Sequence, residues 1–339
     1  MEKIRIAQIG ICHEHASGKI NTLRRLSEVY EIVGVVDDRE TSLTPRLEIN
    51  PAIYEGLKWL TLEEVLNDPT IEAVTVEVPN NDLVPIALRC MERNLPMHMD
   101  KPAGEDLKLY KKLLDGCKER NLPFQMGFMF RGNPAFQFSI EAIKNKLIGE
   151  VFELETDMSH NYGGEAYQEY IGKFAGGIMY NLGCHLIDFV VSALGRPDNV
   201  TPFLKSAPGY QNSIKNNCMA VLEYPHANVI LRACSKDCDG FNARRMRISG
   251  TNGSIIFSPL ELFDGKPVEV TLNLAKAAGG FPAGKHILNF PPQVDRYEVQ
   301  LLELADMIRG KIKSSYTYEH DYLVHEITLA AAGYTRWQK

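Results

Sequence analysis

The chain has 339 residues, of which 24% are charged and 45% hydrophobic, and its formal net charge is −6 at pH 7. This length is enough for two domains with sizeable cores, and the composition is ordinary for a soluble globular protein. The negative charge argues against nucleic acid or an anionic membrane as a partner, and no apolar run approaches the ~20 residues that span a bilayer.

Two further features indicate where the protein works. The first predicted strand begins almost at the N-terminus, so we expect no signal peptide. The seven cysteines are odd in number and scattered, without the paired close spacings of a zinc site. We therefore expect reduced thiols in a cytoplasmic protein.

The first 128 residues alternate short apolar strands with amphipathic helices. Strands are expected at residues 4–9, 32–36, 73–78, 97–99 and 124–128. Thr61 and Glu64 form a capping-box pattern that opens one of the intervening helices. Repeated strand–helix units of this length predict an α/β domain with a doubly wound parallel sheet over residues 1–128.

Residues suited to ligand binding fall at the carboxyl ends of these predicted strands. They are Gly10, Asp37, Pro79, Asn80 and Lys101. Ligands of open α/β sheets bind beyond those strand ends. The sequence therefore predicts a ligand site along that edge of the sheet.

The turn at residues 10–15 is a degraded dinucleotide fingerprint. Gly10 is present, but Cys12 and His15 stand where G-x-G-x-x-G has its second and third glycines. Asp37 lies near the position of the carboxylate that binds the adenosine ribose and repels a 2′-phosphate, whereas Arg39 could accommodate that phosphate. We expect NAD, with NADP possible, in a Rossmann domain; the alternative is a sheet that binds another ligand or none.

His13 and His15 flank Glu14 in the same turn and raise the question of a metal site. They are two residues apart on a loop or first helical turn, so they need not face together. We expect no metal, and a backbone-capping or solvent-facing role for the two histidines.

Strands dominate after residue 128. They are expected at residues 151–158, 218–224, 227–234, 245–249, 254–258 and 267–274. Residues 129–339 are therefore predicted to form an α+β domain with an open, mostly antiparallel sheet. Strands 218–224 and 227–234 are apolar on both faces, so both faces should be covered. Helices would cover one face, and a second subunit is a candidate for the other, giving a homodimer or homotetramer.

A helix through residues 181–194 places Asn181 and His185 on one face, with Asp188 three residues further on. The histidine is either a core residue satisfied by a neighbouring backbone group or a functional one, and this segment alone leaves both readings open. Residues 160–175 are expected to form a Gly- and Tyr-rich loop that suits a polar small-molecule pocket.

Five motifs, taken together with their order along the chain, resemble those of the Gfo/Idh/MocA family. The segments are Asp100-Lys101-Pro102, Pro79-Asn80, Phe130-Arg131 with Pro134, the glycine-to-aspartate helix at residues 176–188, and the hairpin Gly250-Thr251-Asn252-Gly253. The resemblance implies a nicotinamide-binding Rossmann domain and a substrate domain that also mediates oligomerisation. It also implies hydride transfer between NAD(P) and a hydroxyl or carbonyl of a sugar, polyol or inositol-like substrate.

The resemblance also implies residue roles. Lys101 would stabilise the alkoxide that forms as hydride leaves, and His185 would act as general base. Expected cofactor contacts are Gly10, Cys12, His13, Asp37, Arg39, Pro79, Asn80 and Lys101. Expected substrate contacts are Lys101, Arg131, His160, Tyr162, Lys173, Asn181 and His185.

Three departures from the family pattern matter. The fingerprint is degraded, Asp100 replaces a glutamate, and Asn181 stands where the family has the aspartate that partners the catalytic histidine. An asparagine cannot stabilise an imidazolium by charge. Two alternatives therefore stay open: a redox-inactive binding or regulatory protein, and a glycosidase that uses tightly held NAD.

Overall fold

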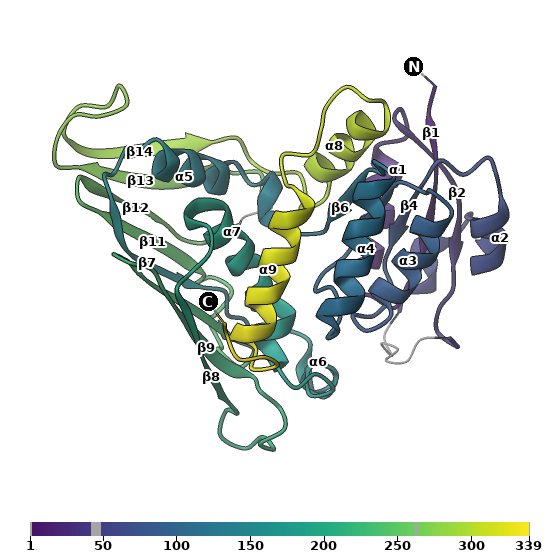
Figure 1. The fold of residues 1–339 in the computed structure, drawn as a ribbon, viewed down its shortest axis with the longest axis horizontal. Coiled ribbons are helices and arrows are strands. Elements are labelled where there is room, and N and C mark those ends of the chain that lie inside the picture. Colours follow the sequence, from purple (N-terminus) through teal and green to yellow (C-terminus); the bar gives the residue numbers. More distant parts are fainter. Residues whose placement is uncertain (1, 42–48, 262–263, 339) are drawn as a thin grey trace. The chain divides into compact units, whose positions relative to one another are not determined.

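The computed structural model describes residues 2–41, 49–261 and 264–338, and it divides into two compact units (Figure 1). The first comprises Met1–Met129 with Asp295–Tyr322, and the second Phe130–Val294 with Leu323–Lys339. The first boundary lies one residue from the expected one. Residues 295–322, which we assigned to the second domain, belong instead to the first unit. The reason is hydrophobic packing: α8 (Glu298–Ile308) lies against β5 and β6, and Leu301 and Ala305 join that unit's core.

The first unit contains a six-stranded parallel sheet in the order β3-β2-β1-β4-β5-β6. Its strands are β1 (Ile4–Ile9), β2 (Tyr30–Val36), β3 (Trp59–Leu60), β4 (Ala73–Val76), β5 (Met97–Met99) and β6 (Phe124–Met126). The doubly wound α/β prediction is confirmed. The strand order reverses between β1 and β4, which is where such sheets open a ligand crevice.

Amphipathic helices accompany this sheet. They are α1 (Ala16–Arg25), α2 (Leu62–Asn67), α3 (Leu83–Glu92) and α4 (Leu107–Glu119), with the short 3₁₀ helix η1 (Pro51–Tyr54) before β3. The expected capping box is present at α2, because Thr61 and Glu64 bond reciprocally through side chain and backbone. Figure 1 shows α3 and α4 side by side, and the two helices pack together.

The second unit contains an eight-stranded sheet in the order β14-β13-β12-β11-β7-β10-β9-β8. Every neighbouring pair is antiparallel except β7 and β10. The strands are β7 (Val151–Asp157), β8 (Asn199–Lys205), β9 (Asn217–Glu223), β10 (Asn228–Cys234), β11 (Arg245–Gly250), β12 (Gly253–Phe257), β13 (Val268–Leu274) and β14 (Gly284–Phe290). The open, mostly antiparallel prediction is confirmed, with β8 and β14 added at the edges.

One face of this second sheet carries helices. α5 (Pro134–Lys144) packs on β13 and on α7 (Cys184–Leu194), while α9 (Tyr318–Ala331) closes the chain. Residues 160–175, expected as a loop, contain α6 (Gly164–Ile171). None of the seven cysteines, all of which are among the described residues, forms a disulfide. Among the described residues, no helix combines the length and apolarity needed to cross a bilayer.

Candidate active site

The turn after β1 runs close against the end of β4. Gly10 has φ +100°, and a Cβ at this position would lie 2.6 Å from the Glu77 carbonyl oxygen. A side chain here would be strained in conformation and would also collide with the backbone. Only glycine therefore fits, which explains why the first glycine of the fingerprint is the one this sequence retains.

The carboxylate that reaches this turn belongs to Asp38. The backbone amides of Ile11 and Cys12 donate to Asp38 Oδ1 at 2.8 and 3.1 Å. Burial raises the pKa of Asp38, and the two amides oppose that rise. The sequence favours Asp37, but spacing does not reveal which of two consecutive aspartates turns inward at a strand end.

Asp37 instead forms an ion pair at the surface. Arg39 donates from Nε to both carboxylate oxygens at 3.0 Å, and its backbone amide also donates to Oδ1. These hydrogen bonds from Arg39 hold the pKa of Asp37 below its ordinary value. The positive charge that could have received a 2′-phosphate is thus engaged by a carboxylate.

A cavity of about 660 Å³ opens beyond the ends of β1, β2 and β4. Its walls include Val36, Asp37, Asp38, Trp59, Val78 and Ile86. A lining of apolar side chains with carboxylates among them fits an adenine ring and the hydroxyls of its ribose. A smaller cavity of about 260 Å³ follows the first turn and includes Cys12, His13 and Glu14 in its lining.

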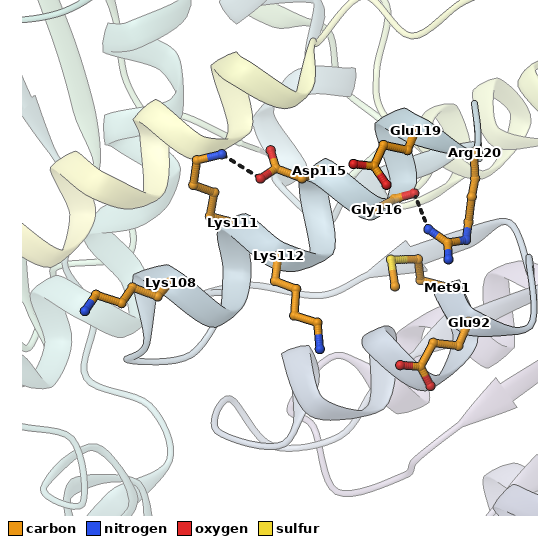
Figure 2. Close-up of a pocket in the computed structure, with 9 residues that line it drawn as sticks. All are labelled: Met91, Glu92, Lys108, Lys111, Lys112, Asp115, Gly116, Glu119 and Arg120. Carbon is orange, nitrogen blue, oxygen red and sulfur yellow. Dashed lines mark hydrogen bonds and ion pairs between the residues drawn. The ribbon is translucent and has the colours of Figure 1, made fainter.

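Another hollow, of about 510 Å³, lies between α3 and α4 (Figure 2). Its walls carry solvated charges, such as Lys111 paired with Asp115 at 2.6 Å. This hollow lies on helix surfaces and not at the carboxyl ends of the strands, where ligands of open α/β sheets bind.

Asn80 lies just after β4 and Lys101 just after β5, and both residues are fully buried. Lys101 Nζ lies 3.3 Å from Glu14 Oε1, so the ammonium is paired with a carboxylate from the first turn. A buried cation needs such a counter-ion, because desolvation without one is costly. Of the expected cofactor contacts, Gly10, Cys12, His13, Asn80 and Lys101 thus gather at adjacent strand ends.

His13 and His15 both lie near Asp100 and neither ring faces solvent, whereas the expected backbone-capping role is present at His13, whose Nδ1 accepts from the His15 backbone amide at 3.2 Å. His15 Nδ1 lies 3.1 Å from both Asp100 oxygens, and His13 Nδ1 lies 3.6 Å from Oδ2. His15 occupies the N-cap of α1 without a side-chain cap. The solvent-facing expectation was wrong because β5 ends beside the turn, and the buried Asp100 carboxylate there bonds the His15 ring.

Burial lowers the pKa of His13 to about 4 and also lowers that of His15, so both rings are neutral at pH 7. Burial by itself would raise the pKa of Asp100. His13, His15 and the Lys19 ammonium outweigh that effect and hold this pKa well below its ordinary value. Asp100 is therefore the ionised member of the cluster.

Lys19 supplies a buried cation beneath this cluster. Its Nζ lies 2.5 Å from His98 Nε2, 3.5 Å from Glu77 Oε1 and 3.7 Å from Asp100 Oδ2. Burial raises the pKa of Glu77 well above its ordinary value. Among the described residues, His13, His15 and Asp100, and likewise Glu77, His98 and Asp100, could group around a metal ion. In the second group, the Lys19 ammonium already lies beside all three residues. In the first group, His15 is hydrogen-bonded to Asp100.

The expected catalytic helix in the second unit begins as a π-helix, η3 (Met179–Gly183), and continues as α7. Asn181 Nδ2 donates to the Tyr167 hydroxyl at 2.9 Å, and both residues are buried. His185 is also buried, with its ring edge-on to Phe130 at 5.8 Å. Irregular turns of this kind are frequent at functional sites.

Tyr167, the partner of Asn181, belongs to an aromatic cluster with His160 and Tyr162. The His160 ring is stacked on Tyr162 with centroids 3.6 Å apart, and it meets Tyr167 edge-on at 5.1 Å. Tyr162 is 47% exposed and offers its ring to solvent, whereas Lys173 is exposed on the turn after α6. The sequence pattern does not distinguish Tyr167 from the other tyrosines of residues 160–175, because its hydrogen bond to Asn181 depends on α6, a helix that was not predicted.

Arg131 forms a buried ion pair with Asp188. Its Nε lies 3.2 and 3.1 Å from the two carboxylate oxygens, and Nη2 lies 2.7 Å from Oδ1. Both side chains are almost fully buried. The pair links the segment after β6 to α7. Arg131 therefore has a structural role in addition to the substrate contact that we expect.

Family models match both halves of the chain. The model described as the oxidoreductase family with an NAD-binding Rossmann fold matches residues 4–128, and that of the GFO/IDH/MocA C-terminal domain matches residues 136–256. The chain belongs to the Gfo/Idh/MocA family of oxidoreductases. NAD(P) is the cofactor of this family, and the glycine turn, buried carboxylate and apolar cavity of the first unit fit its adenosine half.

Individual relatives agree with the family assignment. An uncharacterized oxidoreductase of Schizosaccharomyces pombe is 27% identical over 321 residues, covering 89% of this chain and 84% of the relative. The D-xylose 1-dehydrogenase (NADP(+)) 2 of Haloferax volcanii is 23% identical over 163 residues, 48% of this chain and 49% of its own. The solved structure of Bacillus subtilis yvaA superposes with a TM-score of 0.77 at 18% identity, covering 98% of this chain and 96% of that one.

Proposed function

We propose that the protein is an NAD(P)-dependent dehydrogenase that acts on a CH–OH group, or the corresponding carbonyl, of a sugar, polyol or inositol-like compound. The observation that carries the proposal is the Lys101 ammonium, fully buried at the end of β5 and paired with Glu14. The matching D-xylose dehydrogenase supports a hydroxylated substrate.

Bound nicotinamide would accept or donate the hydride. The Lys101 ammonium would stabilise the negative charge that develops on the substrate oxygen, which is the task of a preorganised cation in a water-poor site. His185 would accept the hydroxyl proton, and Asn181, held by Tyr167, would orient the substrate or the imidazole. Arg131, His160, Tyr162 and Lys173 remain proposed substrate contacts.

The direct test follows NAD⁺ or NADP⁺ reduction by absorbance with a panel of aldoses, inositols and sugar acids. Lys101→Met should lower kcat/KM by about 10²–10³-fold on the substrate so found, because one charge-stabilising group is removed. Lys112→Met, on the exposed face of α4, is the matched control and should leave the rate unchanged. Full activity of Lys101→Met would contradict the proposal.

A second candidate is a redox-inactive binding or regulatory protein, and Asn181 is the observation that favours it. This protein would bind NAD(P) without reducing it in the presence of any member of the panel. Cofactor retained through purification, with cleavage of a glycoside and no net reduction, would instead indicate the NAD-assisted glycosidase.

We also infer a homo-oligomer formed through the second sheet. Met219, Val221 and Ile230 are half-buried on the sheet face opposite Ala220 and Leu222, which are buried. Apolar side chains left on an open sheet face favour a covering partner. A second copy of the chain is the partner we propose.

A further inference from the structure

Two of the three departures from the family pattern meet in space. His15 stands at the third glycine position of the fingerprint, and Asp100 stands in place of a glutamate. These residues are 85 positions apart in the chain, yet His15 Nδ1 lies 3.1 Å from both oxygens of Asp100. The two changes therefore complement each other and build a pair that the usual motifs lack.

The orientation of the His15 ring follows from its partner. An ionised carboxylate only accepts hydrogen bonds, so Nδ1 carries the proton and donates it to Asp100. Nε2 is then the basic nitrogen of the ring. A buried aspartate that fixes one imidazole nitrogen and leaves the other basic is the arrangement used by proton-accepting histidines in catalytic triads.

The basic nitrogen faces the residue that pairs with Lys101. His15 Nε2 lies 3.8 Å from Glu14 Oε1, and the same oxygen lies 3.3 Å from Lys101 Nζ. Glu14 is partly exposed, so a small rotation or one bridging water closes the longer gap. Lys101, Glu14, His15 and Asp100 thus form a polar chain within the first unit, with hydrogen bonds at its two ends and the 3.8 Å separation between Glu14 and His15 in the middle.

We propose that this chain is a proton relay for Lys101, in which Glu14 is a positioning residue and the His15–Asp100 pair is the terminal proton acceptor. The inference rests on the proposed dehydrogenase function. It gives the substrate proton an outlet in the nucleotide-binding unit that does not depend on His185, whose expected aspartate partner is Asn181.

The proton inventory balances during oxidation. The substrate O–H bond breaks and its proton passes to Lys101 Nζ, as Lys101 hands one of its own protons to Glu14 and Glu14 delivers a proton to His15 Nε2. Bound oxidised nicotinamide would supply the acceptor for the hydride from the same carbon. At the end Lys101 and Glu14 are unchanged, and His15 is an imidazolium stabilised by Asp100.

Every charged or titratable neighbour of His15 is compatible with this task. Asp100 and Glu14 favour its protonated form, whereas Lys101 and burial favour the neutral form, so the resting ring is free to accept a proton. His13 meets it edge-on, Tyr297 from the segment before α8 packs at 5.7 Å, and Lys19 from α1 pairs with Asp100 behind it.

The decisive measurement uses NMR of ¹⁵N-histidine-labelled protein saturated with NAD⁺. We expect His15, identified by its loss in His15→Asn, as the Nδ1–H tautomer at pH 7, with a pKa below the ordinary value. Asp100→Asn should lower this pKa further. An Nε2–H tautomer, or a His15 pKa that Asp100→Asn leaves unmoved, overturns the relay even if no substrate has been found.

The kinetic arm separates the relay from the proposed function. Wild-type oxidation should rise with pH through the His15 pKa. His15→Asn should remove this rise with pH and lower kcat by about 10²-fold. Asp100→Asn should move the rise to lower pH. Glu14→Gln should lower kcat more than it changes KM. His226→Asn, an exposed histidine, is the control. If the wild type turns over and His15→Asn keeps its pH profile, the relay fails and the proposed function stands; if the wild type reduces no cofactor with any substrate, the proposed function fails.

Discussion

Asp37 and Asp38 follow β2 in immediate succession and perform different tasks. Asp38 accepts the two amides of the first turn, and Asp37 engages Arg39. Carboxylates at this strand end favour ribose hydroxyls over a 2′-phosphate. Because Arg39 is already paired with Asp37, we expect this edge of the sheet to bind NAD more tightly than NADP.

Replacing Asp37 tests that preference. Asp37→Ser removes one negative charge and releases Arg39, so the ratio of the NADP⁺ to the NAD⁺ dissociation constant should fall by about tenfold or more, as expected for one gained charge-assisted hydrogen bond. Isothermal titration calorimetry with each cofactor measures both constants. Asp239→Ser, exposed in the second unit, is the control. A wild type that binds NADP⁺ more tightly would contradict this reading.

Asn181 is the residue at which the chain keeps the expected position and loses the expected charge. Asn181→Asp should raise the oxidation rate by about tenfold or more, because a carboxylate there can stabilise a protonated histidine. Steady-state rates on the identified substrate measure the effect. Tyr167→Phe removes the hydroxyl that Asn181 contacts and separates that hydrogen bond from the charge. An unchanged or lower rate in Asn181→Asp would argue against its role beside His185.

The sequence was sufficient to propose most of these residues but not their contacts. Gly10, Asn80 and Lys101 could be named because parallel strand ends share one edge. The pairing of His15 with Asp100 could not, because it depends on the distance between the ends of β1 and β5, which no spacing along the chain records. The choice between Asp37 and Asp38 likewise depends on how the backbone leaves β2.

At the level of elements, strongly patterned segments were predictable and weakly patterned ones were not. The capping box of α2 and the apolar strands β9 and β10 lie where expected. The edge strands β8 and β14 were missed because much of their surface is exposed and β8 contains Pro202, which is tolerated at a sheet edge. The two-residue strand β3 has too little pattern to detect.

The Arg131–Asp188 pair links two elements of the second unit and allows a stability test. Arg131→Met should lower the free energy of unfolding by about 3–5 kcal/mol, because it leaves the Asp188 carboxylate buried without its partner. Chemical denaturation measures this change. The double variant Arg131→Met/Asp188→Leu should recover most of the loss. If the recovered protein still shows a strongly raised KM, Arg131 also contacts the substrate as proposed.

At the scale of the whole chain, sequence order and structural units coincide only in part. The boundary near residue 129 follows the end of the strand–helix alternation. The return of residues 295–322 to the first unit could not be read from local pattern, because Leu301 and Ala305 show only that α8 is amphipathic. Which core an amphipathic helix joins is a long-range property.

The open face of the second sheet makes a prediction about the assembled protein. Strands β9 and β10 present Val221 and Ile230 on that face, and the exposed Phe203, which pairs with Met219, extends it over β8. Burying such a surface against another copy removes apolar area from water at about 25 cal/mol per Å². We therefore expect a dimer or tetramer at micromolar concentration, measured by light scattering coupled to size exclusion.

Charge introduced on this face should separate the subunits. Ile230→Glu would bury a carboxylate in the subunit interface, so the measured mass should fall toward that of one 38.1 kDa chain while the circular dichroism spectrum stays native. Val299→Glu, on the exposed side of α8, is the control and should keep the wild-type mass. A wild type that is monomeric at micromolar concentration would refute the interface, and the exposed apolar side chains would then need another partner. An Ile230→Glu protein that keeps its mass would place the interface on a different surface.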